Sequence, residues 1–137
     1  MKHLALILAL SAGPVLSEEI TLIDADSLNW KSTPEGVAFA PLEGDRFAEA
    51  YRAMVRLPSG TTSPPHIKTA SMIGVMLQGR MRHFAARSDP ANAPEVGPGG
   101  FYKIPGGLAH VSSCVSEEPC ITYLYQDAAF DFVPVTE

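Results

Sequence analysis

Residues 60–79 constrain the fold of this chain more than any other stretch. The stretch starts at Gly60, contains the dipeptide Pro64-Pro65, and ends with an apolar run that Gly79 closes. Glycine and proline favour turns or extended conformations, and a residue that precedes proline is biased away from the helical region. We therefore predict a loop, a strand, a short break, a buried strand and a turn, in that order.

Two basic side chains, His66 and Lys68, follow the prolines and are two residues apart. In a strand, alternate side chains lie on the same face, with Cα atoms about 6.6 Å apart. We therefore expect the two side chains to point the same way and to line one pocket.

The order of residues in this stretch resembles the first motif of the cupin family, in which a glycine leads to His-x-His, then a Glu, then a closing glycine. Along that pattern His66 takes the first ligand position, Lys68 the second histidine, Met72 the glutamate and Gly79 the final glycine. Two of the three ligands of this motif are thus replaced.

A later stretch, residues 99–114, is similar to the second cupin motif, which runs Gly, Pro-x-Gly, x-x-His and a later Asn. The matching residues are Gly99, Pro105-Gly106-Gly107 and His110, with Cys114 at the Asn position. The resemblance covers most of the chain after Trp30 and is closest to a subgroup of secreted, single-domain cupins. It implies an all-β fold, a cupin-type double-stranded β-barrel (jelly roll), in which His66 and His110 face each other.

Length and charge narrow the classes of function. A chain of 137 residues suits a single domain with a sizeable core. Ten basic against fifteen acidic residues argue against a nucleic-acid partner and against a basic membrane-binding face.

Residues 1–17 have the layout of a secretory signal peptide, with a basic start, an apolar core and small or apolar residues before Glu18. Glycine and proline interrupt the apolar run well before the ~20 residues that a membrane-spanning helix needs. We expect cleavage near Ser17, a periplasmic or secreted protein without a membrane span, and a single cupin-like domain over residues 18–137. The alternative is a buried N-terminal helix or a membrane anchor.

Alternation of apolar residues predicts the other strands. It is weak over residues 20–30, where we expect a first strand, and clear over residues 50–57, where we expect one buried face. His83 lies in a similar alternation, and two positions remain open for its side chain. It is either a third nitrogen ligand inside the barrel, or it is exposed or hydrogen-bonded to a backbone group. The tail, residues 130–135, is expected to add an edge strand or to pack across the outside.

Cys114 and Cys120 flank a predicted hairpin turn, residues 115–119, between two strands expected to pair with each other. Directly opposed residues of neighbouring antiparallel strands lie within disulfide range, and an exported protein meets an oxidising compartment. We therefore predict a disulfide. The alternative makes Cys114 a thiolate ligand beside His110, although four residues of strand separate the two by about 13 Å.

Three functions fit these residues. In the first, His66, Lys68, Tyr102 and His110 line a site for a small, anionic ligand without a tightly held metal. The second is a metal-dependent cupin enzyme of the oxygenase or isomerase type. The third is an interaction module that forms a homodimer through its edge strands.

For the enzyme, His66 and His110 are the candidate ligands of a divalent cofactor such as Fe, Mn or Zn. Two imidazoles hold such an ion weakly, and a protonated Lys68 has no lone pair to donate. A softer variant adds the thioether of Met72 and binds copper.

Overall fold

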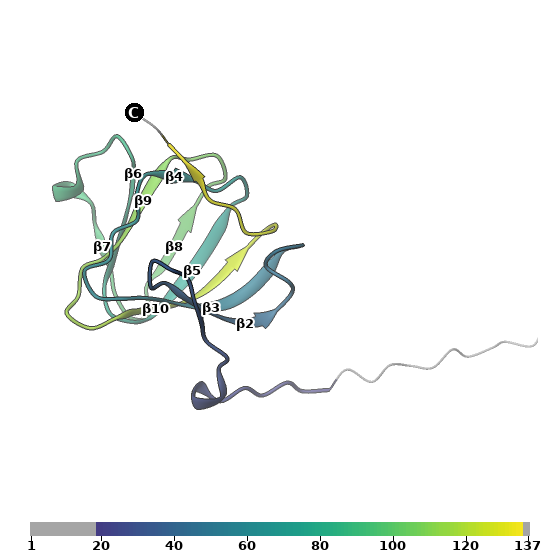
Figure 1. Cartoon of the computed structure of the whole chain (residues 1–137). Coiled ribbons are helices and arrows are strands. Elements are labelled where there is room, and N and C mark those ends of the chain that lie inside the picture. The colour runs from purple at the N-terminus through teal and green to yellow at the C-terminus, as the bar shows by residue number, and fades with distance from the viewer. Residues whose placement is uncertain (1–18, 136–137) are drawn as a thin grey trace, which may run out of the picture.

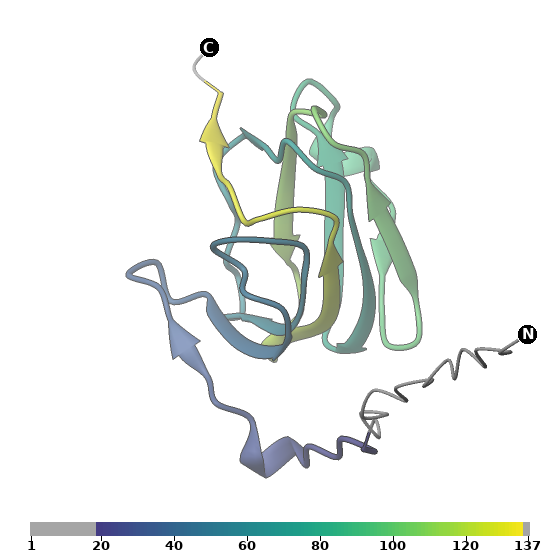
Figure 2. The ribbon, with the colours of Figure 1, turned by 90° about the vertical axis from the view of Figure 1, so that its right-hand side faces the viewer.

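The protein forms two antiparallel β-sheets that face each other as a barrel (Figure 1, Figure 2). The coordinates, a computed structural model, describe residues 19–135, so the expected signal peptide, residues 1–17, lies outside the described residues. The all-β, cupin-type jelly-roll fold predicted from the two motifs is confirmed.

One sheet has six strands and the other has five. In spatial order, the six-stranded sheet consists of β1 (Lys31–Ser32), β2 (Ala38–Glu43), β3 (Tyr51–Leu57), β10 (Cys120–Gln126), β5 (Met72–Gln78) and β8 (Phe101–Ile104). The five-stranded sheet consists of β11 (Val133–Pro134), β4 (His66–Ile67), β9 (His110–Cys114), β6 (Met81–Ala85) and β7 (Glu95–Val96). Two short 3-10 helices, η1 (Ala25–Ser27) and η2 (Pro90–Asn92), interrupt the loops.

Strand β3 shows why the alternating pattern succeeds. Its residues Tyr51, Ala53, Val55 and Leu57 are buried between the sheets, and the side chains between them point outward. Because side chains of a strand alternate between faces, one stripe of apolar residues is enough to place β3 against the core.

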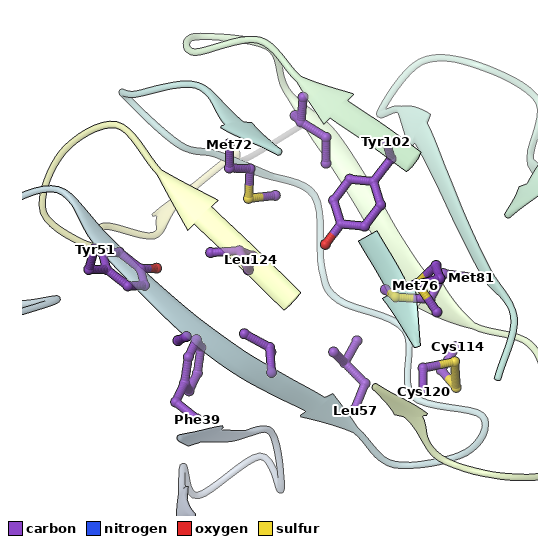
Figure 3. Close-up of a cluster of buried hydrophobic side chains, with 13 residues drawn as sticks. Phe39, Tyr51, Leu57, Met72, Met76, Met81, Tyr102, Cys114, Cys120 and Leu124 are labelled. Carbon is purple, nitrogen blue, oxygen red and sulfur yellow. A yellow bond between two sulfur atoms is a disulfide. The ribbon is translucent and has the colours of Figure 1, made fainter. Parts of the chain in front are cut away.

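The space between the sheets is filled by apolar side chains, among them Met72, Met76 and Tyr102 (Figure 3). Gly74 lies between the two methionines on β5, and a Cβ atom added to it would overlap the ring of Tyr102. The glycine of this strand therefore makes room for a tyrosine ring in the core.

The cysteines join the two sheets, which differs from the hairpin expected around them. β9 pairs with β4 and β6, whereas β10 pairs with β3 and β5 in the other sheet. β10 has a neighbour on each edge, so no edge remains for β9. The sulfur atoms of Cys114 and Cys120 are 2.09 Å apart and their Cα atoms 5.7 Å apart, and both residues are buried.

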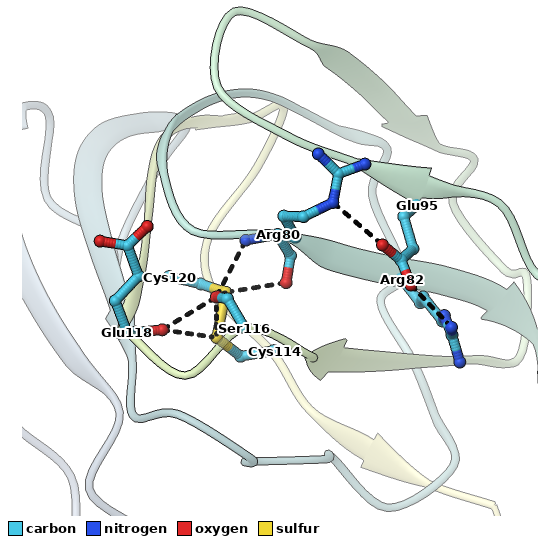
Figure 4. A network of polar contacts seen from close by, with 7 residues as sticks. All are labelled: Arg80, Arg82, Glu95, Cys114, Ser116, Glu118 and Cys120. Carbon is cyan, nitrogen blue, oxygen red and sulfur yellow. Dashed lines mark hydrogen bonds and ion pairs between the residues drawn. A yellow bond between two sulfur atoms is a disulfide. The ribbon is translucent and has the colours of Figure 1, made fainter.

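A polar network surrounds this cross-link (Figure 4). The hydroxyl of Ser116 donates to the carbonyl of Glu118 at 2.9 Å and accepts from the backbone N–H of Arg80 at 3.0 Å. The turn between the sheets is therefore held by hydrogen bonds as well as by the cysteines.

The first strand expected over residues 20–30 is wrong. Residues 19–27 are exposed and form no strand, and their only regular element is η1, whose first turn is capped by Asp24. The segment lies away from the barrel in both views (Figure 1, Figure 2). No helix in residues 19–135 is long and apolar enough to cross a membrane.

Candidate functional site

The two motif histidines meet inside the barrel. His66 on β4 and His110 on β9 are directly opposed, and their ring centroids are 4.2 Å apart at 52°. His110 is 1% exposed and His66 is also buried. The first and second cupin motifs thus converge on one pair of imidazoles.

The hydrogen bonds of these rings determine which nitrogen carries the proton. Nδ1 of His66 lies 2.9 Å from the carbonyl oxygen of Pro64, and Nδ1 of His110 lies 3.0 Å from that of Leu108. A carbonyl oxygen only accepts, so each Nδ1 is the donor and each Nε2 of the neutral ring keeps its lone pair. Nε2 of His110 is buried and has no hydrogen-bond partner.

Lys68 lies beside the histidines and is only 5% exposed. Its ammonium donates to the backbone carbonyl of Asp131, and none of the ion pairs among residues 19–135 includes it. Burial lowers the pKa of Lys68 to about 8, which still leaves it protonated at neutral pH. The buried cation thus contacts a neutral oxygen and aromatic rings directly, and the carboxylate of Asp131 acts on it from beyond ion-pair distance.

We call the end of the barrel formed by His66, Lys68 and His110 the barrel mouth. Residues 130–132 cover it. The ring of Phe132 stacks on His66, with centroids 4.1 Å apart at 12°, and the ring of Phe130 lies 3.5 Å from the ammonium nitrogen of Lys68.

The polar groups of this tail are also engaged. A carboxylate oxygen of Asp131 accepts from the backbone N–H of Thr69 at 2.9 Å, and the N–H of Phe130 donates to the carbonyl of Arg46 at 2.6 Å. After them, β11 pairs with β4, so the expected edge strand exists. The residues before it close the mouth, a role that was not foreseen because no local pattern marks a contact between segments some sixty positions apart.

His83 points into the barrel, and the exposed or backbone-satisfied alternative is wrong. Its ring centroid is 4.1 Å from that of Tyr102, its Nδ1 is 2.9 Å from the hydroxyl oxygen of Ser112, and its buried Nε2 has no hydrogen-bond partner. The signal was available in the sequence, because His83 has the same strand parity as the buried Met81.

Tyr102, expected in the ligand site, lies deeper in the core. Its hydroxyl is 3.2 Å from that of Thr122, its ring packs on His83, and burial raises its pKa to about 12. The aromatic and polar contacts of Tyr102 involve neither His66 nor Lys68. It forms the wall behind His83.

The histidines of the barrel are neutral at pH 7. Burial lowers the pKa of His66 and of His83 to about 4, and it also lowers the pKa of His110. Neutral rings offer lone pairs to a ligand, so among His66, Lys68 and His110 the formal charge is that of Lys68.

These residues do not fit the metal that cupins ordinarily hold. Lys68 donates to Asp131, and the thioether of Met72 packs in the apolar core. Across residues 19–135, no three side chains of the His, Cys, Asp or Glu type are placed to hold one ion. His66 and His110 alone fall short of the three protein ligands typical of a catalytic zinc site.

Two surface cavities open elsewhere. One, of about 480 Å³, lies beside His83 and the loop that carries η2. The other, of about 330 Å³, lies beside Arg46, Phe47 and Tyr51. Neither cavity is lined by His66, Lys68 or His110. The barrel mouth itself is filled by residues 130–132.

Comparison with known proteins agrees with this fold. A family model described as the ChrR cupin-like domain matches residues 18–129. No curated protein sequence matches the chain significantly.

Among solved structures, the polyketide cyclase RemF from Streptomyces resistomycificus superposes with a TM-score of 0.67 at 17% identity, over 87% of each chain. An RmlC-like cupin from Shewanella frigidimarina superposes with a TM-score of 0.64 at 13% identity, over 84% of this chain and 95% of that chain. A chain of the Rhodobacter sphaeroides SigE complex with the anti-sigma ChrR superposes with a TM-score of 0.58 at 20% identity, over 76% of this chain and 51% of that chain.

At such identities the superpositions show the fold alone. The family model, in contrast, spans most of the sequence. The chain is therefore a member of the ChrR cupin-like domain family.

Proposed function

We propose that the barrel mouth binds a small molecule with a carboxylate group, without a tightly held metal. The observation that carries this proposal is the buried ammonium of Lys68, which has no carboxylate within ion-pair distance among residues 19–135. A buried charge is costly unless it is paired and hydrogen-bonded. An anionic oxygen would supply the missing pair.

The carbonyl oxygen of Asp131 indicates where that oxygen would bind. It accepts one of the three N–H donors of Lys68. A carboxylate in the same place would accept this hydrogen bond and also bring the opposite charge, which a neutral carbonyl lacks.

The histidines suggest a second group on the ligand. Nε2 of His110 is a buried acceptor without a donor. A hydroxyl group would provide the donor, so a small hydroxy acid matches both Lys68 and His110 better than a plain carboxylic acid does.

Binding at this position requires the tail to move, because Phe130, Asp131 and Phe132 occupy the barrel mouth. The segment that follows is held by β11, which pairs with β4 over two residues only. So short a pairing opens at lower cost than the long central strands. The tail is thus the part of the barrel that a ligand displaces.

We also infer that this binding takes place in the periplasm or outside the cell. Cys114 and Cys120 lie at disulfide distance, and disulfides persist in oxidising compartments. The predicted signal peptide, residues 1–17, supports the same location. Mass spectrometry of the exported protein tests both, since it gives the N-terminal residue and the mass of the cross-linked chain.

Calorimetric titration with glycolate and with acetate tests the site. We expect the natural chain to bind glycolate more tightly than acetate. The affinity for glycolate should fall at least tenfold in Lys68→Met. It should be unchanged in the control Lys103→Met, because Lys103 is an exposed lysine on β8. Failure of both acids to bind, or equal binding to Lys68→Met, would contradict the anion site. Equal binding of the two acids would contradict the role of the hydroxyl.

Elemental analysis of protein purified without chelator tests whether the barrel mouth lacks a tightly held metal. One iron, manganese or zinc per chain would overturn it and favour the metal-dependent enzyme; loss of that metal in both His66→Ala and His110→Ala would then identify the ligands. The double variant Lys68→His/Met72→Glu restores the ligand set of the family. We expect it to take up metal that the natural chain does not hold.

A further inference from the structure

The six-stranded sheet carries an apolar surface on the side that faces away from the core. A cross-strand row of paired residues runs across β3, β10, β5 and β8, formed by Met54, Tyr123, Val75 and Phe101. All four have the strand parity opposite to that of the buried residues, and Phe101 is 60% exposed. We define the outer face as this row together with Ile73 and Leu77.

Such a surface is unusual on a sheet of this kind. Antiparallel sheets with one solvated face ordinarily place polar side chains on that face. Contiguous exposed apolar patches on soluble proteins mark interaction sites. Within residues 19–135, Phe101 at 60% and Leu77 at 48% exposure leave the β5 and β8 side of this face open to solvent, whereas Met54, Val75 and Tyr123 are half-buried.

A second exposed apolar stretch lies at the start of the described residues. Residues 19–27 extend away from the barrel, and they carry Ile20, Ile23 and Leu22, the last 88% exposed (Figure 2). Ile20 and Leu22 are two residues apart and share one face when the segment is extended. The segment therefore presents an apolar stripe about the width of one strand.

The charges of the two surfaces are complementary. The charged side chains that β3 and β8 point outward are all basic: Arg52, which is paired with Glu43 of β2, and Arg56 and Lys103, which are in no ion pair among residues 19–135. Those of residues 19–27 are all acidic: Glu19, Asp24 and Asp26. Opposite charges around an apolar contact orient the partners and exclude wrong ones.

The start of the first strand fixes where the segment leaves the barrel. The guanidinium of Arg56 lies 4.6 Å from the ring of Trp30, so Trp30 packs at the β3 side of the outer face. From there the segment runs away from its own barrel (Figure 1, Figure 2), and Ile20 and Leu22 stay exposed.

We propose that two copies of this chain form a dimer in which residues 19–27 of each copy cover the outer face of the other. The contact is reciprocal, as a two-fold axis requires. Leu22 and its neighbours pack on the row that includes Phe101, and the acidic residues of the segment face Arg56 and Lys103. This differs from pairing through edge strands, since it uses the face of the sheet.

Sedimentation velocity over a wide concentration range tests the dimer with single variants of the whole protein. We expect the natural chain to dimerise, and Leu22→Asp and Phe101→Asp each to weaken the dimer at least tenfold. The matched control is Phe47→Asp, since Phe47 is 71% exposed but lies on the loop after β2, off the outer face. This control should dimerise like the natural chain.

An equimolar mixture of Leu22→Asp and Phe101→Asp distinguishes the proposed exchange from other arrangements. In the mixed dimer, the intact segment of one variant meets the intact face of the other, so one of the two contacts is restored. We expect the mixture to associate more tightly than either variant alone. A natural chain that stays monomeric, a dimer that Leu22→Asp leaves unchanged, or a mixture no tighter than its components would each overturn the proposal.

Discussion

The ammonium nitrogen of Lys68 lies 3.5 Å from the centre of the Phe130 ring, and the same ammonium donates to the carbonyl of Asp131. The tail therefore supplies both a π face and an oxygen to one buried charge. A desolvated cation–π contact contributes about 2 kcal/mol. The position of the tail over the barrel mouth and the protonation of Lys68 are therefore coupled.

The first prediction concerns the pH dependence of anion binding. Burial lowers the pKa of Lys68 to about 8, so the charge is present at pH 7 and is lost as the pH rises through that value. We expect the affinity for glycolate to fall steeply above pH 8 in the natural chain. Calorimetry at pH 7 and pH 9 measures the change, and an affinity that is equal at both would count against Lys68 as the binding charge.

Stability should depend on pH through the buried histidines. Burial lowers the pKa of His66 and His83 from 6.5 to about 4, so between these values the unfolded chain binds more protons than the folded one. The free energy of unfolding therefore decreases as the pH falls through this window, by up to ~1.4 kcal/mol per pH unit for each histidine, and no histidine contribution changes above it.

Urea unfolding at pH 7 and pH 5 checks this window. His66→Gln and His83→Gln should each lose less stability between the two pH values than the natural chain does. Carboxylates contribute equally to all three proteins and cancel in the comparison. Parallel losses in all three would show that these rings do not titrate as expected.

Removing the ring that covers the barrel mouth should change the titration of the histidine beneath it. Phe132 stacks on His66, so Phe132→Ala admits water and raises the pKa of His66 from about 4 toward its ordinary value. An NMR titration of the imidazole signals measures the pKa. Val133→Ala, one residue further on β11, is the control and should leave it in place, whereas an unchanged pKa in Phe132→Ala would mean that the tail does not shield His66.

Loss of the cross-link should lower stability without affecting the barrel mouth. Closing a short loop restricts the unfolded chain, so Cys114→Ala/Cys120→Ala should reduce the free energy of unfolding by ~2 kcal/mol. His110 and Cys114 lie at opposite ends of β9, so glycolate affinity should stay within a factor of two. Dithiothreitol should destabilise the natural chain in urea and leave the double variant unaffected; equal effects on both would argue that the cysteines are not joined.

Much of the barrel could be predicted because its signals are local. The spacing of glycine, proline and histidine in two motifs located His66 and His110, and the alternation around Val55 located a strand with one buried face. These patterns depend only on strand geometry and on which residues turns accept.

The rest depends on partners that a local pattern does not specify. The strand after Cys120 pairs in the other sheet because β3 and β5 already flank it, and Phe132 reaches His66 across most of the second half of the chain. The sequence left the position of His83 open. Its strand parity was informative, but the position of the ring depends on the room that Tyr102 leaves inside the barrel.

The cross-link between Cys114 and Cys120 makes the two ends of the barrel mechanically unequal. We expect thermal opening of the sheets to pivot at the linked end and to be widest at the other end, where aromatic contacts, a few hydrogen bonds and the two paired residues of β11 hold the tail. Solvent and solutes therefore exchange through that end, and the backbone amide of Ile67 should trade its hydrogen for deuterium before that of Leu124 does.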